Sequence, residues 1–96
     1  MNAEQKELFH LAVLRVLDAN RTRYGLTATT IGFHLAQFGF TPGNGGGAEK
    51  FAERIADTLE YICNKQCAEE VTKTLDAANR AWRITPTGIA HIDERG

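Results

Sequence analysis

The segment Arg80–Gly88 constrains the fold more than any other part of the chain, because it reads as a strand that runs directly into a capped helix. Trp82 and Ile84 alternate with less apolar neighbours, and a period of two is typical of a half-buried strand. Thr85 follows as a good N-cap, and Pro86 takes the first helical position, where its missing N–H removes no hydrogen bond. The segment therefore predicts a strand over residues 81–84 and a helix that begins at Pro86.

A second strand is predicted just upstream, from Cys67 to Leu75. The residues 76–79 between the two strands are rich in Asp, Ala and Asn, which favour a turn. We therefore expect a two-stranded hairpin. Trp82 is expected to cover the core.

Three helices are predicted before the hairpin, from about Ala3 to Asn20, from Thr27 or Thr29 to Phe38, and from about Ala48 to Lys65. Apolar residues recur at helical spacing in each. A glycine-rich loop, residues 39–47, separates the last two. The expected class is mostly α (α+β), with residues 1–96 forming one domain.

Leu11 and Leu14 are exceptions in the first helix, because they fall on its polar arc. One interpretation is that wing or loop residues cover them. The other is that they form an exposed apolar patch that pairs two subunits as a homodimer, since such patches often mark interfaces.

The third helix divides into a predicted core face and two polar edges. The core face is expected to hold the apolar residues Phe51, Ala52, Ile55, Ala56, Leu59, Ile62 and Cys63. One polar edge is acidic, with Glu49, Glu53, Asp57 and Glu60. The other carries Lys50, Arg54, Tyr61 and Lys65. An acidic edge is repelled by phosphates, whereas the basic edge could lie along a nucleic-acid strand.

The patterns of known cofactor and catalytic sites are absent from the sequence. The glycine-rich loop continues as Gly47, Ala48, Glu49 and Lys50, without the Ser or Thr that a P-loop needs after its lysine. Two cysteines and three scattered histidines do not match a structural zinc site. We therefore expect no metal, no cofactor and no enzymatic activity.

Charge and hydropathy restrict the partner and the compartment. Eleven Lys and Arg stand against 12 Asp and Glu, a net charge of −1, so any DNA binding must depend on local segregation of charge. The longest apolar runs are too short to span a bilayer, and the N-terminus lacks the pattern of a secretory signal. The two cysteines are too few for a disulfide framework, so the expected compartment is the cytoplasm.

Three segments together resemble a known class of regulator. They are the run from Leu26 to Ala36, the spacing of Ile55, Leu59 and Ile62, and the turn from Trp82 to Gly88. In this pattern the chain resembles small bacterial winged helix-turn-helix proteins of the MarR, ArsR and PadR types. The resemblance implies three helices, a two-stranded hairpin wing, a short C-terminal helix and a role in transcription regulation.

Two functions follow as hypotheses. The first is a regulator that binds double-stranded DNA through the third helix, the wing and the flanking loop, using Lys50, Arg54, Tyr61, Lys65, Arg80, Arg21 and Arg23. The second is a winged helix that serves as a protein-interaction module without DNA binding. Its surface would be either the acidic edge of the third helix or the patch at Leu11 and Leu14.

Overall fold

The computed structural model describes residues 3–41, 47–72 and 79–95. Its elements, in chain order, are α1 (Ala3–Ala19), β1 (Leu26–Thr27), α2 (Ala28–Leu35), the 3-10 turn η1 (Ala36–Phe38), α3 (Gly47–Asn64), β2 (Ala68–Thr72), β3 (Ala81–Ile84) and α4 (Pro86–Arg95). The described part of the chain is mostly helical with a small antiparallel sheet, which confirms the predicted α+β class.

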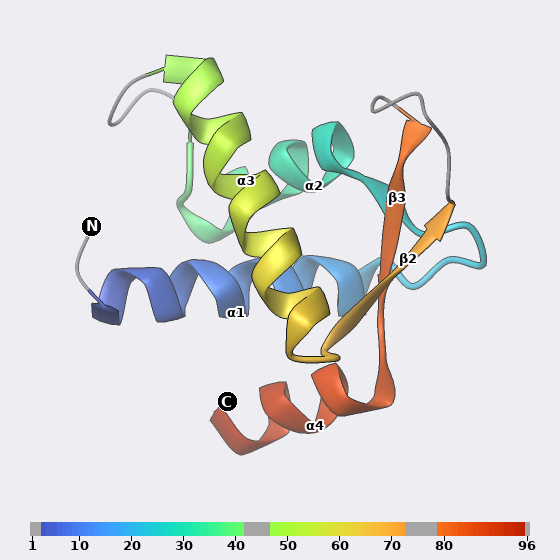
Figure 1. The fold of residues 1–96 in the computed structure, drawn as a ribbon. Coiled ribbons are helices and arrows are strands. Elements are labelled where there is room, and N and C mark those ends of the chain that lie inside the picture. The colour runs from blue at the N-terminus through green and yellow to red at the C-terminus, as the bar shows by residue number, and fades with distance from the viewer. Residues whose placement is uncertain (1–2, 42–46, 73–78, 96) are drawn as a thin grey trace.

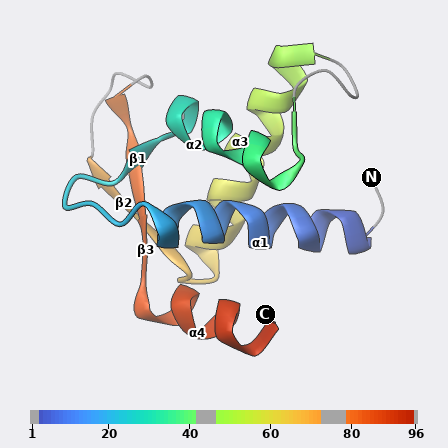
Figure 2. The same ribbon diagram turned by 180° about the vertical axis from the view of Figure 1, so that it is seen from behind.

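The helices lie on one side of a three-stranded sheet (Figure 1). α1, α2 and α3 pack against one another, and α4 runs beneath α1, as the reverse view shows (Figure 2). The strand order is β1-β3-β2, with both neighbouring pairs antiparallel. β2 is therefore an outer strand, and β3 is the central one.

The N-cap predicted at Thr85 is present, and Thr27 caps a second helix. The Thr27 hydroxyl accepts a hydrogen bond from the Thr30 amide at 3.3 Å, so α2 begins at the earlier of its two predicted positions. The Thr85 hydroxyl accepts from the Gly88 amide at 3.1 Å, and α4 begins at Pro86 as predicted. Short polar side chains thus fix both helix starts.

β1 is a strand that the sequence did not predict. Its two residues pair with β3, Leu26 opposite Trp82 and Thr27 opposite Ala81. Gly25 precedes it with a φ of +73°, and a Cβ at this position would lie 2.6 Å from the Trp82 carbonyl oxygen. Two residues are too few to show a period, so the strand is defined by its partner rather than by its own pattern.

The core lies where α1, α2, α3 and the inner face of the sheet meet. Its most deeply buried large side chains are Phe9, Leu14, Leu17, Ile31, Leu35, Leu59 and Ile62. Phe40 contacts Phe9 edge to face, with ring centroids 5.2 Å apart. Trp82 is 8% exposed, which confirms its place over the core.

The expectation of an exposed patch at Leu11 and Leu14 is wrong. Leu11 is 7% exposed and Leu14 is 1% exposed. α4 packs against α1, and Leu14 faces a cavity that Thr87 and Ala90 of α4 also line. A helix, rather than wing or loop residues, therefore covers this side of α1, and these leucines offer no surface for a homodimer.

The core face of α3 is rotated from its predicted position. Ala52 and Ala56 were expected in the core but are exposed, whereas Thr58 is buried at 4% exposure. Thr58 lies on the side of α3 that faces Phe9 and His10 of α1. The neighbouring helix therefore decides which residues are buried, and an alanine gains little from burial compared with its large neighbours.

Two predicted segments lie partly outside the described residues. Residues 42–46 belong to the glycine-rich loop, and residues 73–78 include the end of the first hairpin strand with Leu75 and most of the turn. In the described part of the chain, no helix is both long and apolar enough to cross a membrane.

Candidate functional site

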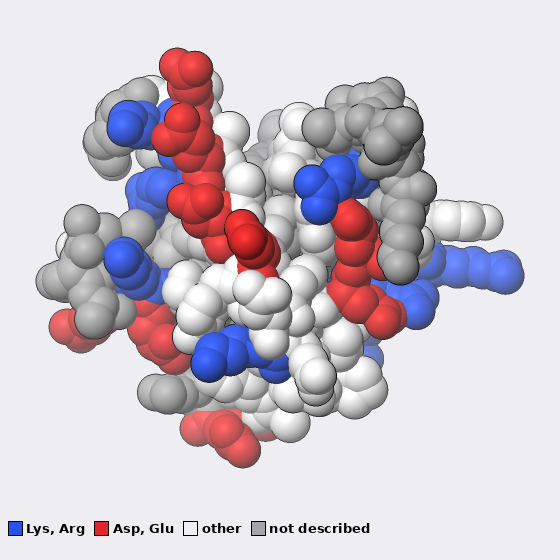
Figure 3. Space-filling view, viewed as in Figure 1, with Lys and Arg blue, Asp and Glu red and all other residues white. Residues whose placement is uncertain are grey.

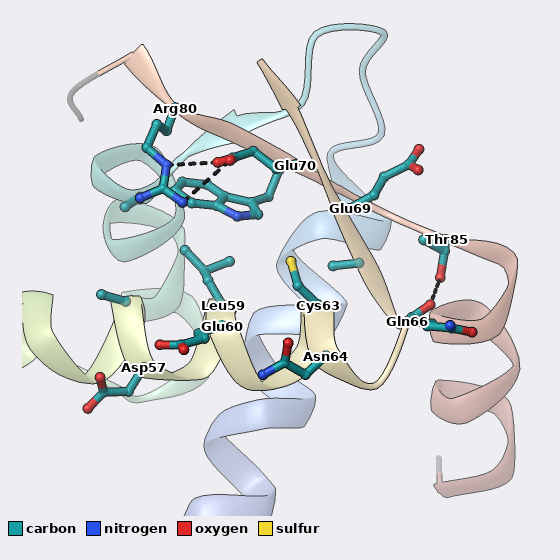
Figure 4. Close-up of a pocket in the computed structure, with 14 residues that line it drawn as sticks. Asp57, Leu59, Glu60, Cys63, Asn64, Gln66, Glu69, Glu70, Arg80 and Thr85 are labelled. Carbon is teal, nitrogen blue, oxygen red and sulfur yellow. Dashed lines mark hydrogen bonds and ion pairs between the residues drawn. The ribbon is translucent and has the colours of Figure 1, made fainter. Parts of the chain in front are cut away.

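A groove of about 720 Å³ lies between α3 and the β2–β3 hairpin (Figure 4). We call it the hairpin groove. Its apolar lining residues are Ala28, Ala56, Leu59, Cys63, Ala68 and Trp82. Its polar lining residues are Asp57, Glu60, Asn64, Gln66, Glu69, Glu70, Arg80 and Thr85. The exposed Ala56 of α3 leaves this space open, because a larger side chain there would fill it.

The base of the groove is apolar and chemically inert. Leu59 and Trp82 are buried beneath it, and Cys63 is half-buried. Burial, together with the nearby charge of Glu70, raises the pKa of the Cys63 thiol, although Arg80 opposes this shift. The thiol therefore stays protonated near neutral pH and behaves as a small apolar side chain.

The margins of the groove are acidic. Asp57 and Glu60 contribute carboxylates from α3, and Glu70 contributes one from β2. In Figure 3, acidic residues run along α3 and a second acidic group lies on the hairpin, with uncharged surface between them. Among the lining residues in the described part of the chain, Arg80 is the one cation. The groove thus combines apolar surface with an excess of negative charge.

Arg80 lies directly over the indole of Trp82. Its guanidinium carbon is 5.2 Å from the ring centroid, within the range of a cation–π contact. Its Nε donates to Glu70 Oε1 at 2.7 Å, and one of its terminal nitrogens donates to Glu70 Oε2 at 3.4 Å (Figure 4). The hydrogen bond and charge of Glu70 raise the pKa of Arg80, so the guanidinium stays positively charged.

Glu69 and Glu70 point to opposite faces of the hairpin, as neighbours in a strand do. Glu69 pairs with Arg83 across the ladder, and its carboxylate points away from the Arg80–Glu70 pair (Figure 4). Trp82 stands opposite Glu70 in the register. The strand alternation therefore places one ion pair in the hairpin groove and the other on the outer face.

The acidic edge of α3 is exposed along its whole length. Glu49, Glu53, Asp57 and Glu60 are all exposed. We call these four residues the acidic stripe. Three of them are spaced by four residues, so like charges are neighbours on the helix surface and destabilise it. The stripe gives the exposed side of α3 a run of negative charge.

The predicted basic edge of α3 lies beside α1, and Lys50, Tyr61 and Lys65 on it are exposed. The Arg54 guanidinium lies over the Phe9 ring, 4.5 Å from its centroid, and Arg54 is only half exposed. The Tyr61 ring stacks on His10 with centroids 4.5 Å apart. Lys65 lies 5.7 Å from the Tyr61 ring. Arg54 and Tyr61 therefore contact side chains of α1, while Tyr61 remains 45% exposed.

The other predicted DNA contacts are dispersed. Lys50 is exposed in the first turn of α3. Arg21 forms an ion pair with Asp18 at the end of α1, and Arg23 is exposed in the turn before β1. Arg80 is in the hairpin groove with Glu70. The fold brings Tyr61 and Lys65 together but does not gather the seven predicted residues into one basic surface.

A smaller cavity lies between α1, α3 and α4. It is lined by His10, Tyr61, Lys65 and His91, among others, and His91 Nε2 lies 3.8 Å from Glu7 Oε1. Among the residues that the structure describes, no group of three or more His, Cys, Asp or Glu side chains could hold a metal ion. This cavity is lined by both acidic and basic side chains, so it lacks the excess of negative charge found in the hairpin groove.

Sequence reasoning did not identify the hairpin groove. The sequence pattern predicts Trp82 as cover for the core and gives no sign that its ring meets a groove. The useful signal was the period of two, which places Arg80 and Trp82 on one face of the strand. That face meets α3 only in the folded chain.

Comparison with protein families, curated proteins and solved structures finds no match for this chain. The function is therefore inferred from the geometry of the hairpin groove.

Proposed function

We propose that this chain is a winged-helix protein that works as a protein-interaction module, binding a basic segment of a partner protein in the hairpin groove. The observation that carries the proposal is the apolar base of the groove, with Leu59 and Trp82, between carboxylates on α3 and β2. A segment with an apolar side chain beside Lys or Arg complements this surface in both shape and charge.

The element order supports a winged helix. Three helices precede a hairpin, and the short strand β1 completes a sheet of order β1-β3-β2. In such an arrangement the third helix and the hairpin stand side by side, and the groove lies between them. A fold alone does not determine function, so the charge of these two elements decides between the candidates.

The charge of α3 favours a protein partner over nucleic acid. Phosphates are bound by Lys and Arg, and the exposed acidic stripe would face them along the third helix. A basic protein segment is attracted by the same surface, and the attraction would also accelerate its association.

The size of the groove limits what it can hold. A volume of about 720 Å³ is within the usual range for ligand pockets, so it accommodates a few side chains. We therefore expect a short linear segment with one apolar anchor rather than the surface of a folded domain.

Selection from a random peptide library displayed on phage tests this proposal. We expect the bound peptides to share a bulky apolar residue flanked by Arg or Lys. Each should change the fluorescence of Trp82, the single tryptophan of the chain. E60K places a positive charge at the groove and should weaken binding about tenfold or more, the scale of repulsion between like charges across an interface.

E4K is the matched control, because Glu4 is an exposed glutamate on α1 that belongs neither to the groove nor to the acidic stripe. It should leave peptide affinity nearly unchanged. Enrichment of acidic peptides, or peptides that bind E60K as tightly as the wild type, would refute a groove for basic segments.

DNA binding is the second candidate, favoured by the winged-helix element order and by the exposure of Lys50 and Arg23. It differs from the first candidate in the expected effect of Arg80. A phosphate contact would weaken when Arg80 is neutralised. Neutralising Arg80 would instead make a groove for basic segments more negative, and peptide binding would strengthen.

A further inference from the structure

The Arg80 side chain occupies the hairpin groove as a bound guanidinium would. It contacts the Trp82 ring on one side and the Glu70 carboxylate on another. Trp82 is 8% exposed with Arg80 in this position. The groove therefore already displays the two contacts by which proteins bind a guanidinium, an aromatic face and a carboxylate.

A second ion pair on the same hairpin, Arg83–Glu69, provides a comparison for the Arg80–Glu70 pair. Arg83 pairs with Glu69 on the outer face, and its side chain is 47% exposed, as is that of Arg80. The Arg83–Glu69 pair links β3 to β2, and the Arg80–Glu70 pair links β2 to the residue just before β3. Glu69 also lines the groove, but its carboxylate points away from the Arg80–Glu70 pair (Figure 4), and of the two arginines Arg80 is the one that lines the groove and contacts the Trp82 ring, so the hairpin offers an internal comparison.

We propose that Arg80 holds the place of a partner arginine, which displaces it and stacks on Trp82 beside Glu70. The proposal rests on the protein-interaction function above and specifies the partner as a segment that contains arginine. Arg80 then acts as an internal competitor that weakens binding until it swings outward.

The displacement of Arg80 is energetically feasible because its side chain is about half exposed. An ion pair of this kind contributes little to stability, since water solvates both partners when it opens. The incoming arginine restores both contacts, so the exchange conserves the interactions of Glu70 and Trp82. The apolar base of the groove adds contacts for the neighbouring residue of the segment.

Arginine fits this position better than lysine. The planar guanidinium can stack on an indole while it donates two hydrogen bonds to one carboxylate, whereas an ammonium offers a compact charge without a flat face. Arg80 already contacts the Trp82 ring and donates two hydrogen bonds to Glu70.

The test uses N-acetylarginine methylamide as the probe and the indole N–H signal of Trp82 in a proton–nitrogen NMR spectrum as the readout. A single tryptophan gives a single indole signal. We expect R80Q to bind the probe about threefold to fivefold more tightly than the wild type, as expected from the loss of an exposed competing pair. E70Q should abolish the shift, and N-acetyllysine methylamide should bind more weakly than the arginine probe.

R83Q is the control, because it removes the outer ion pair and should leave probe affinity unchanged. R80K is a second variant that keeps the charge but cannot stack as a plane, and it should give an intermediate gain if R80Q does not fold. Equal or weaker probe binding by the folded Arg80 variants would overturn the inference. Peptide selection could still succeed in that case, so the proposed function is tested separately.

Discussion

The Thr85 hydroxyl joins two segments at the start of α4. It donates to the Gln66 carbonyl oxygen at 2.6 Å and accepts from the Gly88 amide at 3.1 Å, while the Thr85 amide donates to the Cys67 carbonyl oxygen at 3.1 Å. The turn that follows α3 is thereby tied to the first turn of α4. The motif identified in the sequence is thus a structural clamp.

Gly88 is required in this clamp by space. A Cβ there would lie 2.1 Å from the Cys67 carbonyl oxygen and 2.7 Å from Ile84 Cγ1. G88A should therefore lower the free energy of unfolding by about 1–3 kcal/mol, as overpacking does, despite the better helix propensity of alanine. Urea denaturation measures the change, and T87A at the exposed neighbouring position is the control. A G88A variant as stable as the wild type would contradict the close approach.

His10 should make stability depend on pH. Burial lowers the pKa of His10, with Lys6 adding to the shift and Glu7 opposing it; Tyr61, Lys65, His91 and Glu94 line the same cavity. The unfolded chain binds this proton more readily than the folded one. The contribution of His10 is therefore fully present above its ordinary pKa of about 6.5 and is lost as pH falls toward the folded value.

H10F keeps a ring against Tyr61 and removes the titration. Between about pH 7.5 and about pH 5.5, the free energy of unfolding should fall more in the wild type than in H10F. Urea denaturation at both pH values provides the comparison. Equal losses in the two proteins would show that His10 does not carry the effect.

The helices and the hairpin could be predicted because their patterns are long or carry a specific cap. Eighteen residues of α3 repeat an apolar period, and Thr27 and Thr85 mark helix starts. β1 has only two residues, so its existence depends on β3. Which residues of α3 are buried, and the packing of α4 against α1, depend on tertiary contacts that the hydrophobic period of a single helix does not reveal.

The side of α1 that α4 covers can be tested by shortening its buried leucine side chain. Leu14 is 1% exposed in the core, whereas Leu8, on the same helix, is 53% exposed. L14A should lower the free energy of unfolding by about 2–5 kcal/mol, because it leaves a cavity. L8A should change it by no more than about 0.5 kcal/mol. A change in oligomeric state for L14A, with stability unaffected, would restore the interface interpretation.

The groove could not be predicted from the sequence, because it forms between elements. Glu60 and Glu70 are ten residues apart in the chain, on α3 and β2, and the exposed Ala56 leaves room between these elements. The helical period predicts Ala56 in the core, and a core residue gives no indication of an open groove beside it. The acidic stripe itself was visible in the sequence, because helical spacing alone defines it.

Across the whole molecule, a net charge of −1 conceals a strongly uneven distribution. Glu53 stands four residues from both Glu49 and Asp57 in the acidic stripe. E53K converts two like-charge neighbours into opposite pairs but places a second positive charge three residues from Lys50, so it should raise the free energy of unfolding by about 0.2–0.5 kcal/mol at low salt. High salt should reduce the gain. A loss of stability in urea denaturation would show that the stripe is not under repulsion.

The choice between a protein partner and DNA is tested most directly by fluorescence anisotropy. A labelled arginine-containing peptide from the selection and a labelled mixed-sequence DNA duplex are each titrated with the wild type and with R80Q, at low and at physiological salt. We expect the peptide to bind, more tightly to R80Q, and the duplex to remain unbound even at low salt. Duplex binding that weakens steeply with salt and is reduced in R80Q would contradict the protein-interaction function and favour the DNA-binding candidate.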